Sequence, residues 1–373
     1  MEFVNTMDYH RNNPDVSLSD YYRKLRLELA ASISAKTKIY LDTKFWVLLR
    51  NGSMYPSKHE QEYHLLQLAL RLVESGSCIF PVSEDVFLEV IRQADKDTLL
   101  NTVKLIDLLS QGVSTLSHDE RIQFELLNFW YSHLDQETYS PQEMVWTKLS
   151  YTMGFGSFTH DGIPESENFI LQKAFTDQMW SISLTDQIEL MISNGAFFDL
   201  PEPPTAEGIN EGQFAHTHEA SSFKQMFMNE LAGWVDVYGD MLCDLTEHSY
   251  TRMTGNSIPE NHIDKERDKT KQEMCNMIYN IFRLDKMGTY LPSARITSGL
   301  YAAVRWDKKQ KFQDHDFHDF RHASAALPYF NHFFTEKRLT HLVTQNQLKF
   351  DQMFGCKVCS KVTQAIKVLE SIL

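Results

Sequence analysis

The spacing of hydrophobic positions changes twice along this chain. Near the N-terminus, YYRKLRLELAASIS predicts a helix, and the compact run KIYL at residues 38–41 predicts a strand that ends in Asp42. A second strand at 78–83 precedes EDVFLEVIRQA, whose apolar positions share one side of a helix. Strands and helices that alternate so closely favour a parallel sheet with right-handed crossovers.

From about 97 to 300 the pattern is helical, and strand-like alternation is scarce. The clearest stripe has apolar residues every three or four positions from Phe223 to Leu245, and we interpret it as core packing. Two stretches rich in Pro, Gly and charge, 197–212 and 251–272, are typical of surface loops.

The final part returns to the alternating pattern. The segment DHDFHDFRHASAAL predicts a helix, which Pro328 should end because proline lacks an amide hydrogen. Strands are expected at 332–335 and 356–359, with helices at 338–345 and 361–373. We therefore expect an α/β fold whose sheet is assembled from both ends of the chain. The expected divisions are an N-terminal helical extension (1–35), a first part of the sheet domain (36–97), an all-helical insertion (98–299) and a second part of the sheet domain (300–373).

Composition limits the classes of function. With 373 residues, 42% of them hydrophobic, the chain can bury at least one full core. We find neither an apolar stretch of roughly 20 residues that would cross a membrane nor an N-terminal export signal, and five cysteines without a disulfide framework suit a reducing compartment. We therefore expect a cytoplasmic protein that does not contact membranes.

The net charge of −14 argues against broad binding of phosphate backbones, which relies on Lys and Arg. Any contact with nucleic acid must therefore be local. The best local candidates precede the acidic segment and are Arg305, Lys308, Lys309 and Lys311.

Acidic residues follow the predicted strands and lie on the predicted helices. Asp42 ends the first strand, where open α/β sheets bind their ligands, although Asp is also a common helix cap. Asp316 and Asp319 would share one side of a helix, and Glu336 ends a later strand. Gathered carboxylates repel one another unless a cation neutralises them. Mg²⁺ prefers such oxygen ligands.

Four segments in this order resemble the PIN-like domain, a superfamily of metal-dependent nucleases. They are KIYLDTKFW, PVSEDVFLEV, the D-x-x-H-A helix with its downstream Pro-Tyr, and FFTEK, which together cover roughly 36–97 and 300–373. The resemblance implies a three-layer α/β/α domain that holds Mg²⁺ or Mn²⁺ over the carboxyl ends of its parallel strands. It implies an endonuclease, with RNA rather than DNA as the expected substrate because RNA is the commoner substrate of the superfamily.

Position by position, the resemblance implies that Asp42, Glu89, Asp319 and Glu336 are catalytic and bind metal, and we add Asp316 to the ligands. Thr335 matches the hydroxyl residue often found before the last acid, and we expect it to contact substrate. We also assign Lys44 to substrate binding, although it stands where many members of the superfamily carry a small polar residue. The helical insertion would select substrate, contact a protein partner or join two copies of the chain.

Other interpretations use the same residues. His318 and His322 stand one turn apart as in zinc peptidases, but Asp319 follows the first of them where a Glu is usual. His318-Asp319 is also the dyad of a class of metal-dependent phosphohydrolases. A third interpretation is a catalytically degenerate PIN-like scaffold that binds a basic protein partner. In that case the histidines would serve structural hydrogen bonds.

Overall fold

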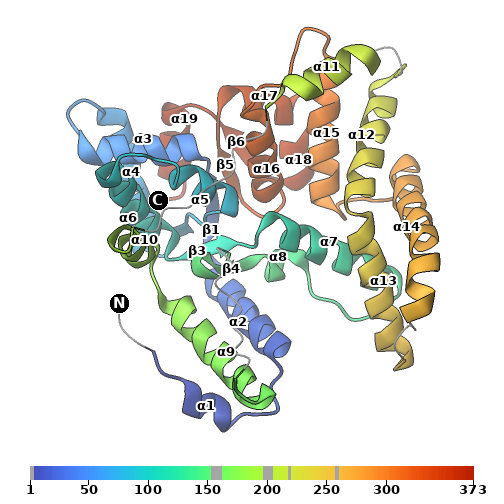
Figure 1. The fold of residues 1–373 in the computed structure, drawn as a ribbon. Coiled ribbons are helices and arrows are strands. Elements are labelled where there is room, and N and C mark those ends of the chain that lie inside the picture. Colours follow the sequence, from blue (N-terminus) through green and yellow to red (C-terminus); the bar gives the residue numbers. More distant parts are fainter. Residues whose placement is uncertain (1–3, 153–161, 196–204, 217–219, 257–259) are drawn as a thin grey trace.

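The structure is a computed structural model that describes residues 4–152, 162–195, 205–216, 220–256 and 260–373, the side chains of 212–216 and 260–266 excepted (Figure 1). Its centre is a parallel four-stranded sheet in the order β2-β1-β5-β6. The strands are β1 (Thr37–Leu41), β2 (Cys78–Ile79), β5 (His332–Phe334) and β6 (Lys357–Cys359). The prediction of a parallel sheet built from both ends of the chain is confirmed.

The register places the two ends of the chain side by side. Leu41 of β1 lies opposite Phe334 of β5, and the Asp42 amide donates to the Phe334 carbonyl at 3.1 Å. At the other end of the pair, the Lys38 amide donates to Asn331 Oδ1 at 2.8 Å. Residues that follow β1 and β5 therefore emerge at the same edge of the sheet.

Helices cover both faces of this sheet (Figure 1). One group contains α3 (Thr43–Met54), α4 (Glu60–Glu74) and α19 (Val362–Glu370), which pack against one another. The other contains α15 (Pro292–Trp306), α16 (Asp316–Ala326), α17 (Lys337–Thr344) and α18 (Phe350–Phe354), while α5 (Glu84–Val90) contacts both α3 and α16. Strands β2 and β5 and most of β1 are buried between them, as expected for a sheet covered on both sides, while the edge strand β6 is partly exposed.

Local sequence explains where the helices beside the sheet begin and end. Asp42 caps α3 by accepting from the Phe45 amide at 3.1 Å, and Ser83 caps α5 by accepting from the Val86 amide at 3.4 Å. Helix α16 ends at Ala326, two residues before Pro328, as predicted. Cys356 and Cys359 are buried free thiols at β6, which matches their interpretation as small residues flanking a strand.

The middle of the chain is largely helical but not entirely so, which corrects the prediction of an all-helical insertion. Strands β3 (Val113–Thr115) and β4 (Trp146–Lys148) form an antiparallel pair. The Thr115 amide donates to the Val82 carbonyl at 2.9 Å, so this pair continues from the end of the β2 segment. The sequence did not reveal these strands, because the segments around them have helical spacing.

The remaining helices form the periphery. They are α1 (Met7–Arg11), α2 (Leu18–Ile33), α6 (Lys96–Ser110), α7 (His118–His133), α8 (Pro141–Met144), α9 (Glu165–Ser181), α10 (Leu184–Ser193), α11 (Glu207–His216), α12 (Phe223–Val237), α13 (Gly239–Thr254) and α14 (Glu260–Arg283). A second hydrophobic core is formed by residues of α7, α12, α13, α14 and α15. It contains Leu231, Trp234 and Ile278. The apolar stripe from Phe223 to Leu245 does serve core packing, but it is divided between α12 and α13 at Tyr238.

The loops predicted at 197–212 and 251–272 are wrong for most of the described residues, since α11 and α14 occupy much of both. Residues 197–204 and 257–259 lie outside the described part. Charged residues with good helix propensity explain the error in α14. Its Arg267 binds Asp244 at 2.7 Å and Glu247 at 3.0 Å on α13, so the charge supports a helix pair. No helix in the described part of the chain combines the length and apolar composition that crossing a bilayer requires.

The contact between α3 and α4 yields a testable prediction about stability. A Cβ atom at Gly52 would lie 2.5 Å from the Tyr63 nitrogen and 2.6 Å from the Glu62 carbonyl carbon, both in the backbone of α4. Gly52→Ala should therefore lower the free energy of unfolding by about 1–3 kcal/mol, measured by urea denaturation. At Gly233 in α12 a Cβ atom would meet nothing within 4 Å, so Gly233→Ala should be neutral or slightly stabilising. Equal effects at the two positions would contradict the close packing of α3 on α4.

Candidate functional site

The carboxyl edge of the sheet gathers acids from separate elements. Asp42 follows β1 and is 3% exposed, while Thr335 and Glu336 follow β5. The pKa of Asp42 is raised to about 6, first by burial and to a smaller extent by the charge of Glu336, against the lowering effects of His322 and of the Phe45 amide. The buried Thr335 hydroxyl also favours the ionised form of Asp42, although it has no hydrogen-bond partner of good geometry. Three of the predicted residues are therefore neighbours.

Asp319 reaches the same edge from α16. Its pKa is raised to about 7, first by burial and then by the charges of Asp42, Glu336 and Asp316, with His322 acting in the opposite direction. Its Oδ2 atom is buried without a hydrogen-bond partner. An unpartnered buried carboxylate oxygen is costly, so among the predicted ligands this atom is well suited to receive a ligand from outside the chain.

Glu89 joins the cluster through a histidine. Burial disfavours its ionised form, but the hydrogen bond and charge of His322, with a hydrogen bond from the Thr43 hydroxyl, lower its pKa to about 2. His322 Nε2 donates to Glu89 Oε2 at 3.1 Å. Glu89 is therefore held as a carboxylate beside α16.

A buried hydrogen-bonded chain orients His322, and sequence reasoning missed it. The ring is 2% exposed, and its Nδ1 lies 2.6 Å from Tyr40 Oη, which in turn lies 2.6 Å from Ser83 Oγ. Burial opposes the charged imidazole, but contacts with Tyr40 and Glu89 raise the pKa of His322 well above its usual value. The apolar run that contains Tyr40 concealed this role, because a tyrosine in a strand is ordinarily part of the core.

Asp316, which we predicted to be a metal ligand, already has partners. It is fully buried, and its two oxygens accept from Arg338 Nε and Nη2, each at 2.8 Å. Oδ2 also accepts from the Gln313 amide at 2.9 Å. A cation would have to compete with a bidentate guanidinium. This geometry favours a structural role for Asp316.

Spacing among ligand atoms separates two groups of residues. In the described ranges, His315, Asp316 and Asp319 form a set whose ligand-type atoms all lie within 4.8 Å of one another. Asp42, Glu89, Asp319 and Glu336 do not form such a set, and they are coupled by charge and through His322 instead. Mg²⁺ keeps several waters and takes only one or two carboxylates directly. Hence the unpartnered carboxylate oxygen Asp319 Oδ2 fits a hydrated Mg²⁺ or Mn²⁺ centred on Asp319, with His315 as a nitrogen donor nearby.

The basic residues expected to bind substrate are not equivalent. Arg305 Nε lies 2.7 Å from Glu230, and its guanidinium lies over the Phe312 ring, so its predicted role as a free phosphate contact is not supported. The others are exposed: Lys44 at the start of α3, and Lys308, Lys309 and Lys311 beyond α15. Among the predicted basic residues, the exposed Lys44, Lys308 and Lys309 show no ion pair of the kind that holds Arg305.

The two-histidine interpretations meet a geometric obstacle. Both ring nitrogens of His322 already contact protein groups, Tyr40 and Glu89. His318 is partly buried, which lowers its pKa, and its Nδ1 has no hydrogen-bond partner. A zinc ion shared by these two histidines would have to break the contacts of His322.

The raised pKa values predict how stability depends on pH. In the folded chain, Asp42 and Asp319 hold protons up to pH about 6 and 7, well above the ordinary Asp value of 3.8. Between pH 3.8 and these raised values, the folded state therefore binds more protons than the unfolded state. In metal-free buffer, the free energy contributed by the two groups should be fully present below pH 4 and lost as the pH rises through 6 to 7.

Urea denaturation at successive pH values, with EDTA, should show a fall of at least about 2 kcal/mol across this window. Asp319→Asn removes one titrating group and the repulsion on Asp42, so its curve should be flatter. Glu89 acts with the opposite sign, but only below pH 4.5. Parallel curves for the two proteins would contradict the crowding of Asp42 and Asp319.

Comparison of the chain with protein-family models, curated proteins and solved structures finds no match in any of the three. The described chain is an α/β protein with a four-stranded parallel sheet and many helices, and these comparisons identify no family for it.

Proposed function

We propose that this protein is a metal-dependent endonuclease that hydrolyses phosphodiester bonds, with RNA as substrate in preference to DNA. The observation that carries the proposal is the crowding of Asp42, Asp319 and Glu336 at the carboxyl edge of a parallel sheet. Asp42 and Glu336 both raise the pKa of Asp319 there, Glu336 also raises that of Asp42, and Asp319 Oδ2 is buried without a partner. Such an arrangement is costly in the absence of a cation and is typical of sites that bind one.

The residues of the chain have distinct tasks in this proposal. Asp319 and Asp42 supply carboxylate oxygens, and Glu336 supplies a third from the rim of the site. Glu89, held by His322 and Thr43, stays ionised at neutral pH and is positioned to orient a water molecule. When bound, Mg²⁺ or Mn²⁺ would activate a water and stabilise the charge that develops on a phosphate oxygen. No covalent nucleophile from the protein is needed.

The resemblance to PIN-like domains supports the choice of reaction. In this chain, Asp42 follows β1, and Glu89 lies on α5, which contacts α16. Asp319 and Glu336 precede and follow β5 in the sequence. That order is the one the resemblance implies. The preference for RNA rests on the resemblance alone, so the test must include both nucleic acids.

The test compares cleavage of a mixed single-stranded RNA pool and a DNA pool of the same sequences. Purified protein is incubated with Mn²⁺, with Mg²⁺ or with EDTA. Internal cleavage of RNA that requires Mn²⁺ or Mg²⁺ would support the proposal, and faster cleavage of DNA would overturn the choice of substrate. No cleavage of either pool, together with no shift of the melting temperature by Mn²⁺, would overturn the proposal that the protein is a metal-dependent nuclease.

One observation favours a second candidate, a catalytically degenerate scaffold that binds a basic protein. Several of the acids already have structural partners: Asp316 pairs with Arg338, Glu89 with His322, and Asp42 caps α3. If these contacts are the whole function of the acids, divalent ions should leave the melting temperature unchanged. A Mn²⁺-dependent rise in melting temperature that Asp319→Asn abolishes would exclude this candidate.

A further inference from the structure

A cavity of about 610 Å³ lies away from the acidic edge, between α2, α7 and α13. Helix α2 leads into β1 at its amino end, whereas the acids follow the carboxyl ends of the strands. In Figure 1, α2 and α3 accordingly lie on opposite sides of the sheet along the strand direction. This cavity is therefore separate from the proposed catalytic site.

Arginine and aromatic side chains dominate the cavity wall. Arg23 lies 5.5 Å from the centre of the Tyr139 ring, and Arg252 lies 5.1 Å from that of Tyr131. Arg26 lies 5.3 Å from the Phe124 ring. Such stacking holds each guanidinium plane against a ring while leaving N–H donors at its edge. Walls of this kind suit a ligand with both a flat aromatic part and an anionic part.

The buried guanidinium of Arg26 also points to an anionic ligand. The residue is only 5% exposed, yet its Nε and Nη2 atoms have no hydrogen-bond partner. The nearest carboxylate oxygen paired with it, from Glu120, lies 3.6 Å away, beyond a normal hydrogen bond. Buried polar groups are nearly always hydrogen-bonded, and buried guanidinium donors in a cavity wall point to an anionic ligand that supplies the missing acceptors.

The charge around the cavity also favours an anion. Arg23 pairs with Asp20, and Arg26 lies near Glu120, but neither acid lines the cavity. Arg252 is exposed and has no acidic partner within the described part of the chain. Glu137 is the one acid in the wall. Three arginines in one cavity contrast with a net charge of −14 for the whole protein.

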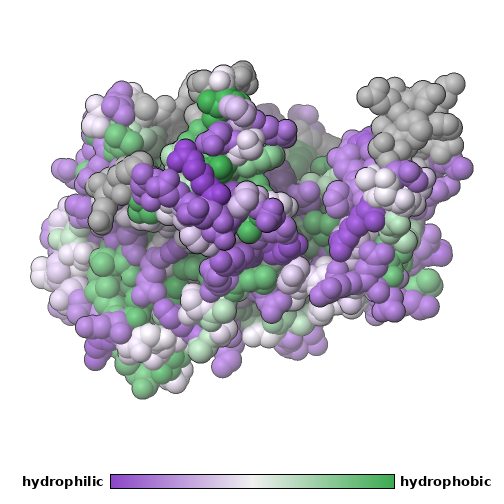
Figure 2. Space-filling view, turned by 90° about the horizontal axis from the view of Figure 1, so that it is seen from below, coloured by the Kyte–Doolittle hydropathy of each residue, from purple (hydrophilic) through white to green (hydrophobic). Residues whose placement is uncertain are grey.

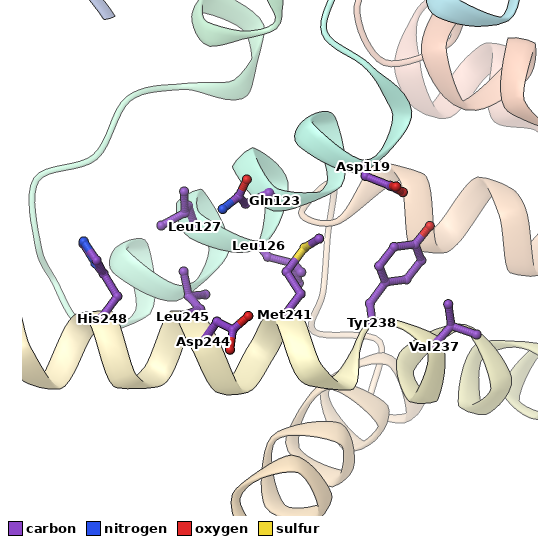
Figure 3. A pocket seen from close by; sticks show the side chains of 10 residues that line it. All are labelled: Asp119, Gln123, Leu126, Leu127, Val237, Tyr238, Met241, Asp244, Leu245 and His248. Atoms are coloured by element: carbon purple, nitrogen blue, oxygen red, sulfur yellow. The ribbon is translucent and has the colours of Figure 1, made fainter. Parts of the chain in front are cut away.

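A neighbouring cavity provides a comparison. It measures about 740 Å³, lies between α7 and α13, and shares Leu127 and His248 with the first (Figure 3). Figure 3 shows its apolar side chains, including Met241 and Leu245, between the two helices, with Asp119 and Asp244 at its margins. It contains no arginine. The surface seen in Figure 2 is mostly hydrophilic, with small separate hydrophobic groups, so large apolar binding faces are not a feature of that side.

We propose that the arginine-lined cavity binds a nucleoside phosphate. The base would stack on Tyr139, whose side chain is exposed, and the phosphate would accept from Arg26 and Arg252. A cavity of this volume lies in the range that small ligands use, and arginine with aromatic rings is the combination that recognises phosphate and base together. The site is independent of the proposed nuclease activity.

The test is isothermal titration calorimetry of the full chain in EDTA, which removes divalent ions that could bring nucleotides to the acidic edge. The probes are AMP, GMP, CMP and UMP, with the corresponding nucleosides and inorganic phosphate as partial ligands. At least one nucleotide is expected to bind at least about 10-fold more tightly than its nucleoside or phosphate alone. Binding of none at millimolar concentration, or equal binding of phosphate alone, would overturn the proposal.

Two exposed positions locate the site. Arg252→Ala should weaken binding at least about 10-fold, and Tyr139→Ala should weaken it about 5-fold, since one loses a charged donor and the other a stacking ring. Arg71→Ala on α4 is the matched control and should leave affinity unchanged. Melting curves establish that each variant is folded. If either Arg252→Ala or Tyr139→Ala fails to fold, the other still tests the location of the site. Unchanged affinity in both would place the nucleotide elsewhere and overturn the assignment.

Discussion

Asp319→Asn is expected to reduce metal-dependent cleavage of RNA at least about 100-fold, the largest effect that we expect from any single substitution. The residue belongs to the His315-Asp316-Asp319 set and is also coupled by charge to Asp42 and Glu336. Loss of groups that merely orient metal ligands typically costs 10–100-fold, so loss of a central ligand should cost at least the upper value. The measurement is the rate of cleavage at saturating Mn²⁺.

Asp97→Asn on α6 is the matched control, because Asp97 is an exposed acid outside the cluster, and its rate should equal that of the unaltered protein. Unfolding cannot explain the loss, because removing a carboxylate with a pKa of about 7 relieves repulsion. The melting temperature of Asp319→Asn in EDTA should therefore be equal or higher. Asp42→Asn should lose activity similarly but also weaken the cap of α3. Full activity in Asp319→Asn would refute the proposed site.

Arg338→Leu is expected to lower the free energy of unfolding by about 2–4 kcal/mol, the largest effect on stability that we expect. The substitution leaves Asp316, which is fully buried, with only the Gln313 amide as a donor. Breaking a buried ion pair from one side costs 3–5 kcal/mol, and we reduce that range because the Arg338 side chain is 24% exposed. Urea denaturation measures the change.

A double-substitution cycle separates the ion pair from the packing of its members. Asp316→Leu combined with Arg338→Leu should recover part of the loss, since no uncompensated charge remains buried. The exposed pair Asp8 and Arg11 is the control, and its coupling should be negligible because water screens it. If Asp316 instead binds the metal, Arg338→Leu should strengthen the Mn²⁺-dependent rise in melting temperature. A coupling near zero would contradict the structural role that we assign to Asp316.

Much of the candidate site could be anticipated from local pattern. Asp42, Glu336 and Asp319 each stand where a strand ends or a helix faces that end, and parallel strands bring their carboxyl ends to one edge. The strands 38–41, 332–335 and 356–359 and the helix stop before Pro328 were found for the same reason: short-range periodicity and proline chemistry determine them. The error at α14 arose because charge is compatible with both loops and exposed helices.

Other features depended on contacts that no local pattern contains. Arg338 forms an ion pair with Asp316, and Glu230 forms one with Arg305. Tyr40, itself bonded to Ser83, orients His322. In each case the partners are well separated in sequence. The β3 and β4 strands, three residues each, exist because they pair with one another and because β3 joins the end of the β2 segment.

The sequence by itself determined the alternation of strands and helices at both ends of the chain and the acids placed after them, because periodicity and turn residues act over a few positions. Only the tertiary structure decided which of those acids have partners, since the charge and burial of a carboxylate depend on groups brought near it by folding. It alone also formed the arginine-lined cavity, whose walls come from helices that are distant in sequence and carry no shared pattern.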